Sequence, residues 1–253
     1  MGFFSNIFGA KKQEVVVQLP DLSAAVVDFH SHLIPGIDDG AQTMDDSINL
    51  IKGLMGFGFK KIITSPHVMS DGYPNTPEII LKGKDAVRNR LKEEGIEIPF
   101  DAAAEYYIDQ TVIDAARSRE LLTFGNNNVL VELSYLTPPL NLTDWFFRLR
   151  SEGYNVVLAH PERYPFYYRK DAEVYEQVKN LGVHFQLNLS SLTGMYGEGA
   201  RKAAEQLIDA GMIDYVATDL HNARHLEYLR KCLSLPYVEK ILNHEFLLNK
   251  QLL

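Results

Sequence analysis

Hydrophobic and polar positions follow two alternating patterns along this chain. Short apolar, β-branched runs recur, and longer stretches with helical periodicity lie between them. Continuous apolar runs of this length are typical of strands that are buried on both faces, as in a parallel sheet. We therefore expect helices to separate strands near residues 25–30, 61–67, 98–107, 128–134, 155–163, 184–191 and 214–222.

The residues between these runs carry the usual signals of helix ends. Thr43 suits an N-cap, Pro77 suits a first helical turn, and Gly95 suits the end of a helix. No linker rich in Pro, Gly or Ser divides the chain. About seven βα units without a break predict one α/β domain over residues 25–253, built as a barrel rather than as an open sheet.

Composition narrows the class of protein. The chain has 253 residues, 46% of them hydrophobic, and a net charge of -8, which argues against non-specific nucleic-acid binding. The single cysteine, Cys232, excludes an internal disulfide framework and suits a reducing cytoplasm. No apolar run reaches the length of a membrane span, so we expect no transmembrane segment.

Residues 1–24 precede the first predicted strand and form an N-terminal extension. Its apolar stretch, "MGFFSNIFGAKK", is too short and too early for a secretory signal, and Asn6 departs from the myristoylation pattern. Two interpretations remain for this extension. It packs on the domain or frays, or it forms a short amphipathic element that touches a membrane surface or a partner.

Six of the seven predicted strands finish on His, Asp or Glu. One such residue is usually structural, and Asp-Asp-Gly is a common turn. In an α/β barrel, however, all strand ends meet at one face, where unpaired carboxylates and imidazoles would desolvate and repel one another. Bound cations remove that cost, so the pattern predicts a metal cluster. The candidate ligands are His30, His32, Asp39, His67, Glu105, Glu132, His160, Asp219 and His221, with Asp38 as the alternative to Asp39.

The types of ligand constrain the metal. Imidazole with carboxylate, and without thiolate, suits Mn, Fe or Zn. Nine donors are too many for one ion, so we expect two or three divalent ions. His30 and His32 lie two residues apart and therefore project from the same face of a strand, where one ion can bind both.

Six ordered motifs carry a family resemblance: "DFHSHLIPGIDDG", "TSPH", "AAEYY", "VELS", "AHPERY" and "ATDLHN". In order and spacing they resemble the polymerase-and-histidinol-phosphatase (PHP) metal-dependent phosphoesterases, and most closely the bacterial protein-tyrosine phosphatases of capsule and exopolysaccharide clusters. The resemblance implies a distorted (β/α)7 TIM-like barrel with three ions, most often Mn. It assigns the ions to three sets: His30, His32, Glu105 and Asp219; Glu105, Glu132 and His160; and Asp39, His67 and His221.

The resemblance also implies arginines that bind the phosphate. Arg163 matches its motif position in "HPERY". Arg224 follows His221 by only three positions, closer than the second arginine of the family, so its role stays open. A metal-activated hydroxide would attack phosphorus while the metals and arginine stabilise the developing charge.

The expected partner is a phosphotyrosine protein, the tyrosine-rich tail of a bacterial kinase that controls polysaccharide export. Such a partner would bring a cytoplasmic enzyme close to the inner membrane, and related phosphatases suggest a homo-oligomer.

Two other functions remain open on the sequence. One is a small-molecule phosphomonoesterase of the histidinol-phosphate type, which a deep, closed pocket would favour. The other is a metal-binding regulatory or scaffold protein without turnover. A cysteine-based tyrosine phosphatase is excluded, because its arginine would lie six positions after Cys232, where the chain has Val238. Aromatic residues near the predicted strand ends either pack at the barrel rim or contact a phosphotyrosine ring; they are Tyr106, Tyr107, Tyr135, Tyr164, Phe166, Tyr167 and Tyr168.

Overall fold

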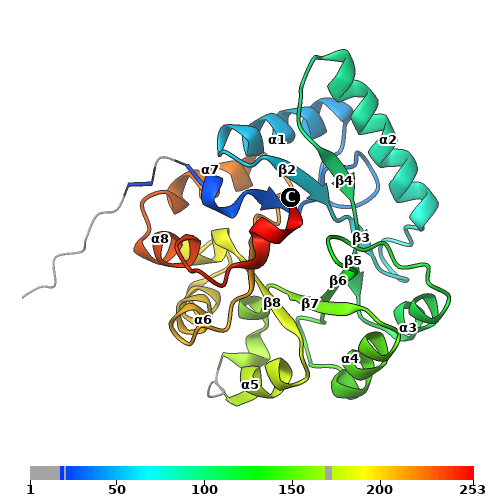
Figure 1. Cartoon of the computed structure of the whole chain (residues 1–253), viewed down its shortest axis with the longest axis vertical. Helices are drawn as coiled ribbons and strands as arrows, with labels where there is room; N and C mark the ends of the chain where they lie inside the picture. The colour runs from blue at the N-terminus through cyan, green and yellow to red at the C-terminus, as the bar shows by residue number, and fades with distance from the viewer. Residues whose placement is uncertain (1–17, 20, 169–172) are drawn as a thin grey trace, which may run out of the picture.

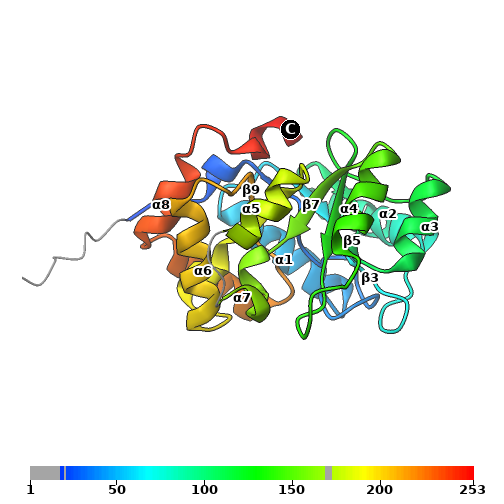
Figure 2. The ribbon, with the colours of Figure 1, turned by 90° about the horizontal axis from the view of Figure 1, so that it is seen from below.

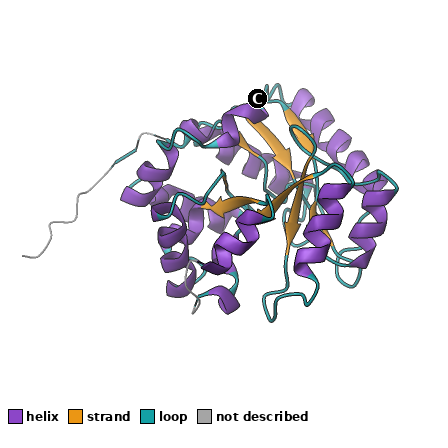
Figure 3. Ribbon diagram, turned by 60° about the horizontal axis from the view of Figure 1, so that its bottom comes forward, coloured by secondary structure: helices purple, strands orange, loops and turns teal. Residues whose placement is uncertain are grey.

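Parallel strands lie at the centre of the molecule and helices surround them (Figures 1 and 3). The computed structural model describes residues 18–19, 21–168 and 173–253. The strands are β1 (Val27–Asp28), β2 (Lys61–Thr64), β3 (His67–Val68), β4 (Phe100–Ala102), β5 (Glu105–Tyr107), β6 (Asn128–Glu132), β7 (Asn155–Ala159), β8 (His184–Asn188) and β9 (Tyr215–Ala217). The predicted α/β fold with parallel strands is confirmed.

The strands occupy seven positions in a distorted ring. β2 and β3 are two halves of one interrupted strand, and so are β4 and β5, which is why the pairing divides into β1-β2-β4 and β3-β5-β6-β7-β8-β9. All strand pairs are parallel. The last strand returns to the first through a parallel bridge between Ser31 and Leu220, and the Asp219 amide donates to the His30 carbonyl at 2.7 Å. The strand pairing is therefore split into two sheets at these interruptions.

The helices begin where the sequence signals place them. Thr43 and Asp46 form a reciprocal capping box at the first helix, and Thr76 caps the second, whose first residue is Pro77. The helices are α1 (Met44–Gly56), α2 (Pro77–Glu93), α3 (Gln110–Arg117), α4 (Leu142–Ser151), α5 (Glu173–Asn180), α6 (Glu198–Asp209), α7 (Ala223–Cys232) and α8 (Pro236–Leu242). Short 3₁₀ turns complete the chain: η1 (Ser23–Ala25), η2 (Pro161–Arg163), η3 (Pro165–Tyr167), η4 (Leu189–Thr193) and η5 (Leu248–Leu252).

Alternate strand residues divide the core into two clusters. In β6, Val129 and Val131 belong to the large cluster that the helices cover, whereas Leu130 belongs to a smaller cluster inside the ring. Phe29 fills this interior, stacked on Phe124 with ring centroids 4.5 Å apart. The barrel is therefore a packed core rather than a channel, as is usual for this architecture.

The turn η5 covers the amino-terminal end of the barrel. Its Asn249 is fully buried; its side-chain amide donates to the carbonyls of Val27 and Val216, and its oxygen accepts from the Val216 amide. This end lies at the top of Figure 2, so the carboxyl ends of the strands face the lower side of that view. The site described next lies at the lower side.

The predicted extension over residues 1–24 falls mostly outside the described residues. Within the part that is described, the Leu19 amide donates to the Leu233 carbonyl at 2.7 Å, and Leu22 is completely buried in the core. None of the helices in the described parts of the chain has both the length and the apolar content that crossing a membrane requires.

Candidate metal centre

Four buried side chains form the inner part of the candidate centre. His30 Nε2 lies 3.2 Å from Glu105 Oε2 and 3.3 Å from Asp219 Oδ1, and His32 Nε2 lies 3.5 and 3.4 Å from the same two oxygens. No more than 2% of any of these residues is exposed. Two imidazoles from the segment after β1, the carboxylate of Glu105 in β5 and that of Asp219 just after β9 therefore converge on one point.

Glu105 links this inner part to a second group. Its Oε1 lies 3.0 Å from His160 Nε2, and its Oε2 lies 3.1 Å from His67 Nδ1. His67 Nδ1 is also 3.1 Å from Glu132 Oε1. Because both oxygens of Glu105 face candidate ligands, this carboxylate has the position that a bridging ligand needs.

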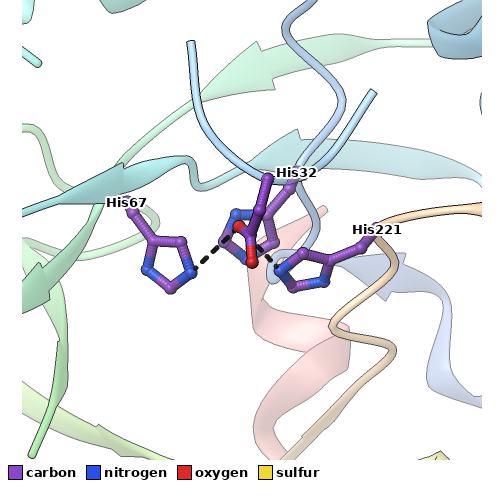
Figure 4. A group of neighbouring side chains, drawn as sticks. His32, His67 and His221 are labelled. Atoms are coloured by element: carbon purple, nitrogen blue, oxygen red, sulfur yellow. Dashed lines mark ion pairs between the residues drawn. The ribbon is translucent and has the colours of Figure 1, made fainter. Parts of the chain in front are cut away.

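A third group lies at the edge that solvent reaches. Asp39 Oδ1 is 3.5 Å from His67 Nε2 and 3.4 Å from His221 Nε2, and His32 is near them. Figure 4 shows the imidazoles of His32, His67 and His221 turned toward one another, with dashed ion pairs to the carboxylate between them. The Asp39 side chain is 54% exposed, whereas the inner carboxylates are buried.

The structure thus brings all nine predicted ligands into one cluster. Four groups have ligand atoms within 4.8 Å of one another: His32, Asp39, His67 and His221; His30, His32 and Glu105; His30, His160 and Asp219; and His67, Glu105 and Glu132. These groups overlap and only partly match the three predicted sets, since His160 lies with Asp219 and His67 with Glu132. The division of the ligands among ions stays a prediction.

The two neighbouring aspartates face in different directions. Asp38 Oδ2 accepts from His32 Nδ1 at 2.8 Å and from the His67 amide at 3.1 Å, while Oδ1 accepts from the Gly40 amide at 3.0 Å. Each oxygen of Asp38 thus already accepts a hydrogen bond from the protein. The geometry therefore favours Asp39 as the ligand and gives Asp38 the role of orienting His32, which a ligating histidine generally needs.

Gly40 lets the loop of these aspartates lie directly against His32, in the segment that follows β1. A Cβ atom at Gly40 would come within 2.1 Å of the His32 carbonyl oxygen, a distance that no side chain tolerates. The Ala41 amide donates to the same carbonyl at 3.0 Å. The third residue of "DDG" is thus required for the close approach that brings Asp38 and Asp39 to His32.

Several atoms at the centre are buried without a hydrogen bond. His30 Nε2, His32 Nε2, His67 Nδ1 and Glu105 Oε2 find no hydrogen-bond partner among the described residues, although carboxylates or imidazoles lie close to each. Unsatisfied buried donors and acceptors cost free energy, and four at one point call for a ligand. Nitrogen and carboxylate donors without thiolate fit Mn, Fe or Zn.

The charges at the centre are strongly coupled. Burial lowers the pKa of His30, but the carboxylates of Glu105 and Asp219 overcome it and raise that pKa to about 9. Burial raises the pKa of Glu105, yet His30 and His67 hold it well below its usual value. The raised pKa values of His30 and His67 favour protons that offset the carboxylates, and metal ions bound at the same place would have to displace those protons.

Two of the candidate ligands have left-handed backbone conformations. His160 has φ 35° and ψ 57°, and Asp219 has φ 51°. Residues other than glycine seldom adopt this region, and where they do the strain is often found at functional sites. His160 comes directly after β7 and Asp219 comes two residues after β9, and their side chains lie near Glu105 and His30 respectively.

The two predicted phosphate-binding arginines differ in their surroundings. Arg163 donates from an Nη to Asp219 Oδ2 at 2.6 Å, and its guanidinium lies 4.0 Å from the Tyr196 ring centroid and 5.0 Å from that of Tyr135. Arg224 is exposed on α7, with its guanidinium 5.9 Å from the Tyr228 ring centroid. Arg163 is therefore held at the cluster, while Arg224 faces another side chain on its own helix.

The aromatic residues divide between packing and the site. The hydroxyls of Tyr106 and Tyr164 accept from backbone amides in the core. Tyr135 stacks on His160, with ring centroids 5.9 Å apart. Tyr73 stacks on His67 at 5.4 Å and was not predicted, because it lies on a loop rather than at a strand end.

The sequence interpretation also overlooked Gln186 and Asn188. Both are completely buried at the end of β8, the one predicted strand without a candidate ligand. Gln186 bonds to His30, and Asn188 bonds to Asp219. The signal was two polar residues at alternate positions of an apolar strand, the same spacing that identified His30 and His32.

The chain is similar in sequence and in structure to known proteins. The chain is 30% identical to the tyrosine-protein phosphatase YwqE of Bacillus subtilis over 79% of this chain and 78% of that protein. It is 24% identical to the putative tyrosine-protein phosphatase CapC of Staphylococcus aureus, over 81% of each. A crystal structure from work on YwqE and on CpsB of Streptococcus pneumoniae, described as unique metal-dependent tyrosine phosphatases, has a TM-score of 0.78 and 28% identity. It covers 87% of this chain and 89% of that one. The family model for capsular polysaccharide synthesis, CpsB/CapC, matches residues 26–249, and the chain belongs to that family.

Proposed function

We propose that this protein is a metal-dependent protein-tyrosine phosphatase, which hydrolyses phosphotyrosine on a protein of capsular or exopolysaccharide synthesis. The observation that carries the proposal is the cluster of nine histidines and carboxylates, in which four buried ligand atoms have no hydrogen-bond partner among the described residues. Family membership and the phosphatase relatives support the reaction class.

Two or three divalent ions, with Mn expected, would be held by the nine residues. His30, His32, Glu105 and Asp219 form the inner set, and Glu105 also faces His160 and His67. Bound there, the ions would supply Lewis-acid charge and a water of lowered pKa. The carboxylates and imidazoles of this chain would hold that positive charge at one face of an otherwise acidic protein.

Arg163 is the side chain best placed to orient a phosphate. One edge of its guanidinium bonds Asp219, and the rings of Tyr135 and Tyr196 lie beside it. A planar guanidinium held in this way matches phosphate oxygens better than a flexible ammonium group does. The phenolate of phosphotyrosine leaves readily, so the reaction demands little help from a general acid.

The exposed edge of the centre supports a protein substrate over a small enclosed one. The Asp39 side chain is 54% exposed, and those of His67 and His221 are 14% and 13% exposed. A phosphotyrosine in an extended segment can reach such an edge. The tail of a bacterial tyrosine kinase is the partner we propose, which would place the protein in the cytoplasm near the inner membrane, with self-association as a further expectation.

The test combines metal analysis with activity. Purified protein should hold two to three transition-metal ions per chain after equilibration with Mn, and should hydrolyse a phosphotyrosine peptide faster than histidinol phosphate. Chelation and His30→Ala should each abolish this activity. Preference for histidinol phosphate would instead identify a small-molecule phosphatase, and metal binding without turnover would identify a regulatory protein.

A further inference from the structure

The strand β8 reaches the same face of the barrel as the ligand-bearing strands, but it ends in two amides. Gln186 and Asn188 lie two residues apart and therefore project from the same face of the strand. Both are completely buried, between the strand end that carries His160 and the one that carries Asp219. A buried amide is retained only where its donors and acceptors are matched, so these two indicate a specific network.

The two amides connect two candidate ligands. His30 Nδ1 lies 2.8 Å from Gln186 Oε1, the Gln186 Nε2 amide donates to Asn188 Oδ1 at 2.7 Å, and Asn188 Nδ2 donates to Asp219 Oδ2 at 2.8 Å. The chain His30–Gln186–Asn188–Asp219 thus consists of three hydrogen bonds. We refer to Gln186 and Asn188 as the amide relay.

The relay can run in only one direction. The Asp219 carboxylate accepts and cannot donate, so Asn188 must present its amino group to it. The Asn188 oxygen then faces Gln186, which must donate with its own amino group and present its oxygen to His30. That oxygen can bond only to a protonated Nδ1, so the proton of His30 lies on Nδ1 and its Nε2 faces Glu105 and Asp219.

The relay also divides the two oxygens of Asp219. Oδ2 accepts from Asn188 and from Arg163, while Oδ1 is the oxygen that faces His30 Nε2 and His32 Nε2. Reversing either amide would set two oxygen atoms against each other in a buried position, which costs the desolvation of both. Gln186, at one end of the relay, therefore fixes the tautomer of His30, and Asn188, at the other end, fixes the orientation of the Asp219 carboxylate.

We propose that Gln186 and Asn188 are positioning residues of the metal centre, which fix the Nδ1-protonated tautomer of His30 and turn Asp219 Oδ1 toward the same metal ion. This rests on the metal centre of the proposed function. It gives β8 a role equivalent to that of the ligand-bearing strands, through residues that never touch the metal. Partners of this kind generally change metal affinity about 10- to 100-fold.

The direct test is the tautomer of His30 in zinc-loaded protein, which is diamagnetic and suited to ¹⁵N NMR of the imidazole nitrogens. The wild-type protein should show zinc on His30 Nε2 and a proton on Nδ1 that exchanges slowly with water. Zinc on Nδ1, or a proton on Nε2, would overturn the proposal without any variant.

Two variants then test the relay itself. Gln186→Met and Asn188→Leu keep similar volumes but remove the bonds to His30 and Asp219. Each should weaken zinc binding by roughly 10- to 100-fold, measured by competition with a chelator. In Gln186→Met the His30 Nδ1–H signal should also shift and exchange faster, because its acceptor is gone. If Asn188→Leu does not fold, Gln186→Met decides the matter alone.

Asn249→Leu is the matched control. Asn249 is an equally buried amide, bonded to the backbone of β1 and β9 at the opposite end of the barrel. This variant should lose thermal stability yet keep wild-type zinc affinity and His30 signals. Relay variants that change zinc affinity no more than Asn249→Leu would refute the proposal. Failure of the proposed function looks different, since zinc affinity would still respond to the relay while the phosphotyrosine peptide stayed intact.

Discussion

Two buried glutamates, Glu105 and Glu162, have opposite properties within the same molecule. Both are completely inaccessible to solvent. Burial raises the pKa of Glu162 to about 7, against hydrogen bonds from Ser191 and the Asn188 amide. Burial also acts on Glu105, but the surrounding histidines hold its pKa well below the usual value. One glutamate can be neutral near physiological pH, while the other stays charged.

The difference shows what makes a buried carboxylate a candidate ligand. Glu162 accepts hydrogen bonds from neutral donors, and the charge of Arg163 offsets only part of the cost of burial, so protonation is favoured because it removes that cost. Glu105 meets three imidazoles within 3.2 Å. Two of them, His30 and His67, have raised pKa values and bring positive charge to this carboxylate, which structural packing alone does not require. When a metal ion binds to such a group of imidazoles and carboxylates, it replaces the protons on the imidazoles.

The largest expected effect comes from changing Glu105 to a neutral residue of the same shape. Glu105→Gln should remove the negative charge that faces both the inner part of the centre and the second group. It should therefore reduce bound Mn to well below one ion per chain. We expect kcat/KM on a phosphotyrosine peptide to fall by at least about 1,000-fold, because the metals supply several kcal/mol of charge stabilisation. Elemental analysis and initial rates measure both effects. If the Glu105→Gln protein kept its full complement of metal, Glu105 would not be a ligand and would not differ from Glu162 in this respect.

Much of this centre could be read from the sequence, because strand ends in a parallel barrel meet at one face. The strand-end positions of His30, Glu105 and Asp219 placed them in one cluster without knowledge of any distance. Asp38 and Asp39 could not be told apart, since their roles depend on which carboxylate the Gly40 turn directs toward His32. The course of the backbone through this turn decides which aspartate is the candidate ligand, and two identical residue types give no information about it.

The strand boundaries were less predictable than the strands themselves. The run over residues 98–107 was expected as one strand, yet it is interrupted between β4 and β5, where the pairing moves from one sheet to the other. Hydrophobic pattern reports burial, and Ala103 and Ala104 are buried whether or not they pair. The sequence did not reveal the amide relay, because Gln and Asn are seldom metal ligands and because their hydrogen-bond partners are distant in sequence.

The second prediction concerns Arg163, whose charge acts on both glutamates. Arg163→Lys keeps the charge but loses the planar, two-pronged geometry. We expect kcat/KM on a phosphotyrosine peptide to fall about 100-fold, the usual effect of losing one well-placed donor to a developing anion. Bound metal should change little. A large loss of metal would instead mean that the bond to Asp219 is the main role of Arg163.

The third prediction tests Glu162 through stability and pH. Its folded-state pKa of about 7 exceeds the ordinary value near 4.5, so the folded protein binds the proton more tightly. The contribution to stability is full below pH 4.5 and is lost as pH rises to about 7. Glu162→Gln removes this loss and should raise the free energy of unfolding at pH 8 relative to wild type by on the order of 1–3 kcal/mol. Urea unfolding of metal-free protein at pH 5 and pH 8 measures the difference.

The two glutamates are compared directly in this experiment. The gain from Glu162→Gln should be much smaller at pH 5, where the wild-type side chain is already protonated in the folded state. Bound Mn should stay at the wild-type level, unlike in Glu105→Gln. An equal effect of Glu162→Gln at both pH values would show that Glu162 is charged in the folded protein and would remove the contrast between the two sites.

The smallest effect is expected at Arg224, which lies outside the surroundings of both Glu105 and Glu162. Its guanidinium faces Tyr228 on the same exposed helix, at 5.9 Å, and an exposed cation–π contact contributes about 0.5–1 kcal/mol. Arg224→Ala should therefore leave bound metal unchanged and alter kcat/KM on a phosphotyrosine peptide by less than about threefold. A decrease of 100-fold, equal to that of Arg163→Lys, would mean that the loop before α7 moves when substrate binds and presents Arg224 to the phosphate. Measuring Arg224→Ala against both the phosphopeptide and a small aryl phosphate separates a contact with the phosphate, which lowers both rates, from a contact with the flanking peptide, which lowers only the first.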